Sequence, residues 1–441
     1  MNRVFLSIYS FLMWVAQPFL RRKLARRSSQ EPGYGEAAQE RFGHYSQPKD
    51  MQADLVWVHA VSLGETRTAA ILVKALRAEY PGLRILLTNG TATGRAEGSR
   101  VLREGDIQVW QPWDSAAAVG RFFEHFRPRL GLLMETEVWP NLMAAAGALA
   151  LPVVLVNGRL SEKSLQRGLA MSPLSMPAFA ALAAVYAQTD DDAQRFRALG
   201  VVAPAVLGNL KFDVRPDNNQ QATGKAWRHA AGYPVLMFAS SREGEEDLLF
   251  AQIISETHKA QADAAIDNAA AKSFSHKFLV VPRHPQRFDA VQALAERHGL
   301  RVSRRSSWVT GPASSEEAMS AEIWLGDSLG EMALYYALSD VALLGGSFEA
   351  LGGQNLIEAA ACGCPVVMGP HTFNFTEAAN LAQAAGAARR ANDIPDALHT
   401  ALTLVADPAA HLAAVAASLA FAVAHRGATQ NTLLALQVFL K

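Results

Sequence analysis

Cysteine is scarce in this 441-residue chain, which holds only Cys362 and Cys364. Two cysteines cannot build a disulfide framework, and their place in a run of small residues before an apolar strand indicates buried thiols in a reducing compartment. A Cys-x-Cys pair without neighbouring histidines is also a poor metal site. A charge excess is lacking as well, since 41 basic residues balance 41 acidic ones. That balance argues against a nucleic-acid-binding protein with a basic body.

Several common motifs are missing too. The chain has no P-loop, no Gly-x-Gly-x-x-Gly after its first predicted strand and no zinc-ligand spacing, which argues against nucleotide hydrolases, NAD-dependent dehydrogenases and metallohydrolases. Residues 190–192 do form an Asp-x-Asp pattern, which some enzymes use to hold a metal. The pattern follows Thr189 at the start of a predicted helix, where acidic residues cap the helix and offset its dipole. We therefore interpret it as a cap and predict no metal site.

The first residues differ from the rest of the chain. An uncharged apolar run extends from Val4 to Leu20 and is followed by the basic residues Arg21, Arg22, Lys23, Arg26 and Arg27. As a helix the run would reach roughly 26 Å, just short of a hydrocarbon core of about 30 Å. Positive charge after the run is the reverse of a cleaved signal peptide and favours a cytoplasmic body. Residues 1–28 are therefore predicted to be a membrane anchor, which either spans the membrane or lies in one leaflet.

The remaining chain is long enough for more than one ordinary core. Short apolar runs alternate with helical patterns over residues 50–212 and again over 233–441, and a polar stretch separates them. Continuous apolar strands between helices are typical of parallel sheets covered on both faces. We predict an α/β fold with two Rossmann-like, doubly wound domains that face a cleft and are joined by a linker at 213–232. Ligands of such folds bind beside the carboxyl ends of the strands.

Three polar residues stand at strand ends of the first predicted domain. Glu65 completes a Ser-x-x-Glu capping box, but its turn also follows a strand and faces the predicted cleft. If the helix N-terminus keeps this carboxylate ionised, it could serve as a general base for a hydroxyl group, so both roles stay open. Glu135 ends an apolar strand and is equally consistent with a cap or a site residue. Lys211, after the last strand, is either a surface lysine or part of the site.

The second predicted domain has binding signals along one rim of its sheet. Arg283 closes a strand, and an arginine fork suits a phosphate group. Glycines before a helix let backbone amides approach an anion, and a glutamate one turn inside the helix can reach a ribose diol. The residues that carry these signals are Pro282, Arg283, Leu329, Gly330, Glu331, Asn355, Leu356, Ile357 and Glu358.

Eight segments carry a resemblance to a known family. In chain order they are VHAVSLGET, METEVWPNL, NGRLS, LGNLKFD, VPRHPQRF, GDSLGEM, GGSFEALGGQNLIEAAACGCPV and MGPHTFNF. They cover nearly the whole chain, and with them the sequence resembles the 3-deoxy-D-manno-octulosonic acid (Kdo) transferases of Gram-negative bacteria, glycosyltransferase family 30. One departure is Gln354-Asn355-Leu356, where many members have His then Asn-Pro, so a contact from that histidine is not carried over.

The resemblance implies a GT-B enzyme at the cytoplasmic side of the cell inner membrane, without cofactor or metal, that moves Kdo from CMP-Kdo to a lipid A precursor in lipopolysaccharide biosynthesis. Glu65 would be the catalytic base, Glu135 and Lys211 would steady the transition state, and the nine residues of the second domain would contact the cytidine nucleotide. Direct displacement would invert the anomeric centre. Two alternatives remain: a GT-B transferase that uses a UDP-sugar for cell-wall precursors, and a non-catalytic nucleotide-sugar-binding membrane protein.

Overall fold

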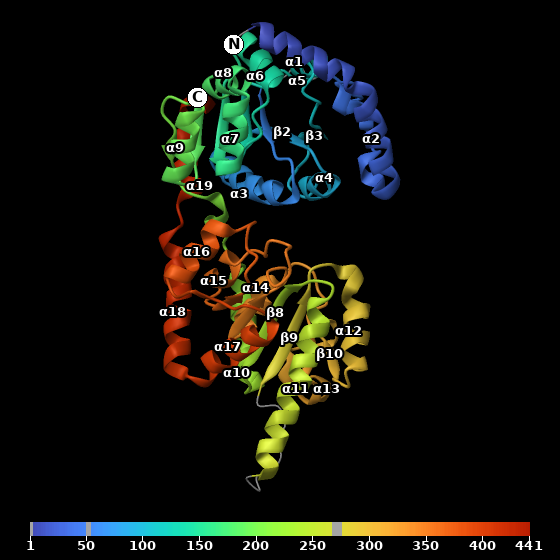
Figure 1. Cartoon of the computed structure of the whole chain (residues 1–441), viewed down its shortest axis with the longest axis vertical. Coiled ribbons are helices and arrows are strands. Elements are labelled where there is room, and N and C mark those ends of the chain that lie inside the picture. The colour runs from blue at the N-terminus through green and yellow to red at the C-terminus, as the bar shows by residue number, and fades with distance from the viewer. Residues whose placement is uncertain (1–2, 50–53, 267–275) are drawn as a thin grey trace. The chain divides into compact units, whose positions relative to one another are not determined.

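The computed structural model describes residues 3–49, 54–266 and 276–441, and the chain divides into two compact units (Figure 1). Unit 1 comprises Met1–Asp213 with His425–Lys441, and unit 2 comprises Val214–Ala424. In each unit the described residues include one seven-stranded sheet, and its paired strands run parallel. The predicted α/β class with two doubly wound sheets is confirmed.

The sheet of unit 1 has the strand order β3-β2-β1-β4-β5-β6-β7. Its strands are β1 (Leu55–His59), β2 (Arg84–Asn89), β3 (Ile107–Trp110), β4 (Leu130–Met134), β5 (Val153–Gly158), β6 (Ala184–Ala187) and β7 (Ala205–Val206). The order reverses between β1 and β4, which is the switch point where ligands of doubly wound sheets bind.

Helices cover both faces of this sheet. They are α1 (Arg3–Val15), α2 (Gln17–Gln30), α3 (Leu63–Glu79), α4 (Ala92–Gly98), α5 (Ala116–Phe126), α6 (Pro140–Ala148), α7 (Glu162–Ala170), α8 (Ser172–Ala180), α9 (Asp190–Ala198) and α19 (Ala428–Leu440). Side chains of β1 alternate between two cores, as a strand buried on both faces requires. Trp57 packs with Phe122 of α5, whereas Val58 packs with Leu72 of α3 and Leu436 of α19.

The sheet of unit 2 has the order β10-β11-β9-β8-β12-β13-β14, with its switch point between β8 and β12. Its strands are β8 (Val235–Ser241), β9 (Lys277–Pro282), β10 (Val302–Arg304), β11 (Ile323–Leu325), β12 (Val341–Leu344), β13 (Val366–Met368) and β14 (Ala388–Arg390). Its helices are α10 (Asn218–Ala231), α11 (Glu245–Ile266), α12 (Phe288–Arg297), α13 (Glu316–Ser320), α14 (Met332–Leu338), α15 (Ile357–Ala361), α16 (Thr376–Ala384), α17 (Ile394–Ala406) and α18 (Pro408–Ala424).

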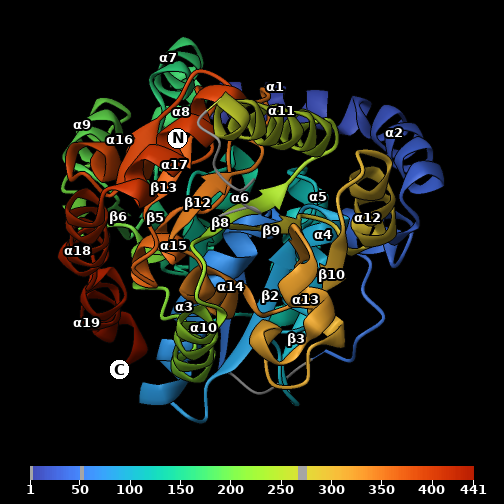
Figure 2. The ribbon, with the colours of Figure 1, turned by 90° about the horizontal axis from the view of Figure 1, so that it is seen from below.

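Two segments differ from the predicted domain boundaries. The predicted linker, 213–232, is mostly helix α10, which Asp217 caps and which packs against α14 (Figure 2). A Cβ atom at Gly224 would lie 2.4 Å from the Leu334 carbonyl oxygen, so glycine allows this close approach. The end of the predicted second domain, His425–Lys441, belongs to unit 1, where Asp213 accepts the backbone N–H groups of Gly427 and Thr429.

Two stretches of the described chain could cross a membrane by length and composition alone. One is Pro408–Leu440, which contains α18 and α19; these helices belong to different units, and each buries apolar residues such as Phe421 and Leu436. The other is the α1–α2 pair, which is bent by 48°. Helix α1 has no buried residue among those described, and most of its large apolar side chains are exposed.

Candidate active site

Glu65 and Glu135 flank the switch point of unit 1. Glu65 lies in the first turn of α3, which follows β1, and Glu135 directly follows β4, the parallel neighbour of β1. The structure thus brings together two carboxyl groups that are 70 positions apart in the sequence, at the edge where the sheet order predicts a ligand.

Glu65 does take part in capping α3. The Ser62 hydroxyl oxygen accepts the Glu65 backbone N–H at 3.3 Å, and the same hydroxyl donates to Glu65 Oε1 at 2.8 Å. The other carboxylate oxygen accepts the backbone N–H of Val61 at 2.8 Å, whereas a standard capping box would use the N–H of Ser62. The cap therefore holds the carboxyl group in place beside the switch point.

The expectation that Glu65 stays ionised needs correction. Burial is the main cause that raises the pKa of Glu65 to about 7, and the negative charge of Glu135 adds to it. Hydrogen bonds from Val61 and Ser62 oppose this shift without cancelling it. A carboxyl group with a pKa near neutrality suits general-base catalysis better than a fully ionised one, because it binds a proton more strongly while remaining largely available.

Glu135 is not a helix cap. Helix α6 begins only at Pro140, and the residue before it is Trp139, so Glu135 lies outside the capping positions. Its backbone has a φ of 59°, in the left-handed region that costs a non-glycine residue about 1–3 kcal/mol and that often occurs at functional sites. Its Oε1 accepts a hydrogen bond from Lys211 Nζ at 2.8 Å.

Lys211 is not a surface lysine. Only 19% of its side chain is exposed, the same fraction as for Glu135, so this ion pair is shielded from water. The backbone around it is held by two asparagines that sequence reasoning missed. Asn209 Oδ1 accepts the Lys211 N–H, and Asn157 Oδ1 accepts the Leu210 N–H. The available sequence signals were an Asn-Gly pair at the end of one apolar run and a Gly-Asn pair at the end of another.

The predicted nucleotide residues of unit 2 lie after successive strands. Pro282 ends β9, and the Arg283 backbone N–H donates to the Ser241 carbonyl at 3.1 Å. Leu329, Gly330 and Glu331 lie between β11 and α14, and Leu329 is 71% exposed. Glu331 accepts hydrogen bonds from Arg305 and from the Ser328 hydroxyl. These segments share the carboxyl edge of the sheet.

The prediction was that backbone amides of the glycine-rich segments approach an anion. In the structure, several of these amides donate hydrogen bonds within the protein. The N–H of Gly353 donates to the Gly346 carbonyl, and the N–H of Gly346 donates to the buried Glu245 carboxylate, so these amides are already used. Asn355 Oδ1 accepts the Ile357 N–H at the start of the short helix α15. Ile357 and Leu356 are buried, which leaves Asn355 and Glu358 as the polar residues of this stretch.

A cationic cluster at the switch point of unit 2 was missed in the sequence. Arg242 follows β8, and its Nη1 donates to His284 Nε2 at 2.9 Å, since a guanidinium has no acceptor. His284 therefore accepts through this nitrogen; burial and then the charges of Arg242, Arg283 and Arg287 lower its pKa. The charged turn after an apolar strand, Ser-Arg-Glu-Gly-Glu-Glu, was the available signal.

The residues at 190–192 form the first turn of α9. The Thr189 hydroxyl accepts the Asp192 N–H, and Asp192 in turn accepts from the Thr189 hydroxyl and the Leu160 N–H. Arg195 lies within ion-pair distance of Asp191 and Asp192. The structure therefore places this pattern as the sequence interpretation did, in a helix cap. Within the described ranges, no group of three or more His, Cys, Asp or Glu side chains is arranged to hold a metal ion.

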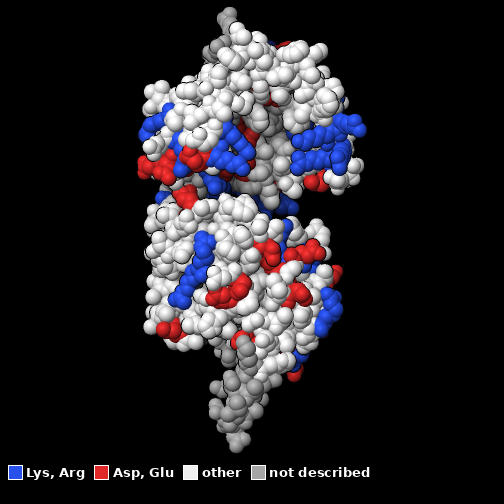
Figure 3. Space-filling view, viewed as in Figure 1, with Lys and Arg blue, Asp and Glu red and all other residues white. Residues whose placement is uncertain are grey.

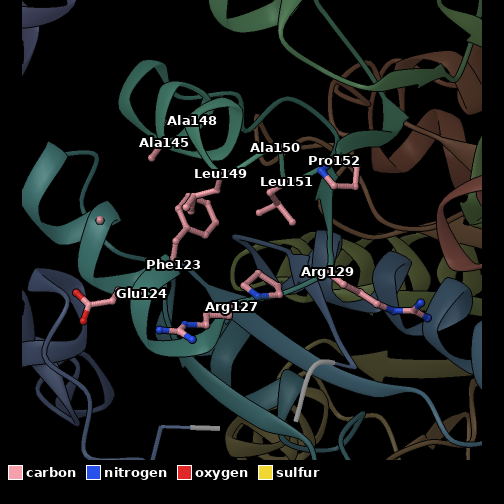
Figure 4. Close-up of a pocket in the computed structure, with 12 residues that line it drawn as sticks. Phe123, Glu124, Arg127, Arg129, Ala145, Ala148, Leu149, Ala150, Leu151 and Pro152 are labelled. Carbon is pink, nitrogen blue, oxygen red and sulfur yellow. The ribbon is translucent and has the colours of Figure 1, made fainter. Parts of the chain in front are cut away.

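A cavity of about 660 Å³ lies at the opposite, amino-terminal edge of the unit 1 sheet. Figure 4 shows Phe123, Leu149 and Leu151 turned toward one another across it. It is bordered by the ends of α5 and α6 and by the residues that lead into β4 and β5. Since ligands of doubly wound sheets bind at the carboxyl edge, we do not assign this cavity to the reaction.

Known proteins resemble this chain in sequence and in fold. A family model described as 3-deoxy-D-manno-octulosonic-acid transferase (kdotransferase) matches residues 36–214. The 3-deoxy-D-manno-octulosonic acid transferase of Bordetella pertussis is 45% identical over 98% of this chain and 99% of its own length. That of Haemophilus influenzae is 30% identical over 89% of each chain. A solved glycosyltransferase from Rickettsia africae is 12% identical, with a TM-score of 0.53 over 88% of this chain and 98% of that one.

Two Rossmann-like units in one chain, each built on a seven-stranded parallel sheet, define the GT-B fold. Within that fold class, the chain belongs to the 3-deoxy-D-manno-octulosonic acid transferase family, and it is an enzyme that transfers Kdo.

Proposed function

We propose that this enzyme transfers Kdo from CMP-Kdo to a hydroxyl group of a lipid A precursor, with inversion at the anomeric carbon and without a metal ion, in lipopolysaccharide biosynthesis. The observation that carries the proposal is the half-buried Glu65 carboxyl group beside the Glu135–Lys211 ion pair at the switch point of unit 1. A non-catalytic sugar-nucleotide-binding protein has no need of a carboxyl group with a pKa near 7 at this place.

The reaction needs one proton transfer and one displacement. Ionised Glu65 takes the proton of the acceptor hydroxyl group. At the same time, the acceptor oxygen forms a bond to the anomeric carbon of Kdo. The bond from that carbon to the phosphate oxygen of CMP breaks, and CMP leaves with the electron pair. Attack from the face opposite the leaving group inverts the anomeric configuration. Lys211, fixed by Glu135 at 2.8 Å, supplies positive charge near the reacting groups.

Unit 2 is proposed to hold the donor. CMP-Kdo carries a phosphate and a sugar carboxylate, so its site should be rich in cations. Arg283, Arg242 and His284 lie at the carboxyl edge of the sheet, on the loops after β9 and β8. With Pro282, the 329–331 segment and the 355–358 segment, they form the proposed donor site.

The lipid acceptor places the enzyme at a membrane. The exposed apolar residues of α1 and the basic residues that follow on α2 support attachment to the cell inner membrane, with the catalytic units on the cytoplasmic side. Attachment would raise the frequency with which the enzyme meets a bilayer-embedded acceptor.

Donor choice tests the proposed function directly. We expect the purified enzyme to add Kdo to a lipid A precursor when given CMP-Kdo and to transfer nothing from UDP-sugars, as measured by mass spectrometry of the lipid product. Transfer from a UDP-sugar, with no product from CMP-Kdo, would replace the proposal by the UDP-sugar alternative.

Metal independence has its own test. The 190–192 carboxylates belong to the α9 cap, and positive charge at the proposed sites comes from Lys211 and the arginines. We therefore expect EDTA to leave the rate of Kdo transfer largely intact. A loss of rate that magnesium or manganese restores would contradict this.

The pH dependence of the reaction tests the coupling between Glu65 and Glu135. The negative charge of Glu135 raises the pKa of Glu65, so Glu135→Gln should lower it below its value of about 7. Because the base must be unprotonated, the rising limb of kcat/KM against pH should move to lower pH. Glu124→Gln, an exposed glutamate of the same unit, should leave this limb in place. A limb that stays or moves upward in Glu135→Gln would show that the two groups are not coupled.

A further inference from the structure

Helix α1 presents a broad apolar face to the outside, whereas Tyr9 and Ser10 are bonded to the rest of unit 1. Seven large apolar residues of α1 are 44–64% exposed, and Phe19 on α2 is 73% exposed. They are Val4, Phe5, Ile8, Phe11, Leu12, Trp14 and Val15. A helix on the surface of a soluble protein has the opposite orientation, with its apolar face turned to the core. So many exposed large apolar side chains on one helix indicate a surface that a membrane or another protein covers.

The inner side of α1 is fixed by hydrogen bonds to buried groups. Tyr9 Oη donates to Asp114 Oδ2 at 2.9 Å, and Ser10 Oγ donates to Asn141 Oδ1 at 2.7 Å. Asp114 is 6% exposed and also accepts the backbone N–H groups of Asn141 and Leu142 at the start of α6. The contacts therefore join α1 to the framework of unit 1, and α1 also packs against α6 and α8.

Helix α2 is held against the same unit. Leu24 is buried, the Arg21 guanidinium lies 3.7 Å from the ring centre of Phe42, and that of Arg27 lies 4.4 Å from the ring centre of Tyr34. Figure 3 shows a basic cluster over α2 beside a largely uncharged surface over α1. Apolar side chains beside guanidinium groups match the acyl chains and anionic headgroups of one leaflet.

The dimensions argue against a transmembrane orientation. Helix α1 has 13 residues, so it is roughly 20 Å long and falls short of a hydrocarbon core of about 30 Å. Extending it with α2 does not yield a straight span, because the pair bends by 48° and α2 is bound to unit 1. A spanning α1 would also have to give up the bonds of Tyr9 and Ser10 and expose their hydroxyls to lipid.

We infer that α1 lies in the plane of the membrane. Its apolar face enters the acyl chains of the cytoplasmic leaflet, and the arginines of α2 contact anionic headgroups. This inference rests on the proposed membrane attachment and adds its geometry: both ends of α1 stay on the cytoplasmic side. The enzyme is thereby held with unit 1, which carries Glu65, at the surface where a lipid acceptor lies.

Labelling of the N-terminus decides between the two orientations. A cysteine introduced as Asn2→Cys is treated with a membrane-impermeant maleimide, while the native Cys362 and Cys364 are buried. The in-plane orientation predicts labelling in inside-out inner-membrane vesicles and none in intact spheroplasts. Labelling in spheroplasts would mean that the segment spans the membrane, and the inference would be wrong.

Charge substitutions test whether the exposed face meets lipid. Ile8→Glu with Leu12→Glu, four residues apart on the exposed side, should lower binding to phosphatidylglycerol-containing vesicles by roughly 100-fold or more, because two apolar side chains lose their burial in lipid and two negative charges meet anionic headgroups. Val438→Glu, a 74% exposed residue on α19 of the same unit, is the matched control and should bind as wild type. Unchanged binding of the double variant would overturn the inference. Absence of Kdo transfer to detergent-dispersed acceptor by the wild type would instead count against the proposed function.

Discussion

Replacing Glu65 by glutamine is expected to reduce Kdo transfer by about two to four orders of magnitude in kcat, the usual cost of losing a general base. Glutamine keeps the shape of the side chain, and its carbonyl oxygen can still accept the Val61 N–H that now binds Oε2. It cannot take a proton from the acceptor hydroxyl. The rate should be measured with saturating CMP-Kdo and detergent-dispersed acceptor.

Capping and catalysis by Glu65 are separated by measuring stability and nucleotide binding in parallel. We expect Glu65→Gln to unfold at nearly the wild-type temperature and to bind CMP normally. Glu162→Gln is the matched control, because Glu162 also stands in the first turn of a unit 1 helix, α7, but with a side chain 63% exposed. Near-normal turnover of Glu65→Gln would leave this residue with its capping role alone.

Central strands and edge strands of the two sheets leave different signals in the sequence. Central strands such as β1, β4 and β8 are buried on both faces, so they appear as continuous apolar runs. The strands β10 and β14, which show no such apolar run, lie at the two edges of their sheet. They are three residues long and read Val-Ser-Arg and Ala-Arg-Arg, because an edge strand is less enclosed and tolerates charge.

Long-range contacts account for the two differences between the predicted and the observed domain boundaries. Helix α10 has few apolar residues, and its packing on α14 depends on Gly224, a residue that weakens a helix in isolation. The return of α19 to unit 1 depends on Asp213, more than 200 positions earlier in the chain. Neither contact leaves a local pattern in the sequence.

The site residues could be placed by the sequence at strand ends, but their electrostatics could not. The pKa of Glu65 depends on burial and on Glu135, and the position of Lys211 depends on backbone N–H groups that Asn157 and Asn209 accept. The helix N-terminus, taken alone, would keep Glu65 ionised. In the structure the cost of burying the charge exceeds this effect.

Replacing Arg283 by alanine is expected to weaken binding of both CMP and CMP-Kdo by roughly one to two orders of magnitude, the usual effect of losing a charge-assisted hydrogen-bond donor worth about 1.5–3 kcal/mol. Both ligands carry the phosphate that this guanidinium is proposed to contact, so both affinities should fall together. The backbone contact of Arg283 with Ser241 does not involve its side chain and should persist. Isothermal titration calorimetry with each ligand measures the two affinities.

Three companion measurements make the Arg283 result specific. Arg283→Lys keeps the charge but loses the two-pronged geometry, so its affinity should lie between wild type and Arg283→Ala. Arg301→Ala is the matched control, since Arg301 is 65% exposed, pairs with Glu322 and stands just before β10, at the amino-terminal edge of the same sheet. It should bind CMP as the wild type does. Vesicle binding of Arg283→Ala should also be unchanged, because α1 and α2 belong to unit 1. Normal CMP affinity in Arg283→Ala would remove this arginine from the donor site and, with it, the main support for assigning the donor to unit 2.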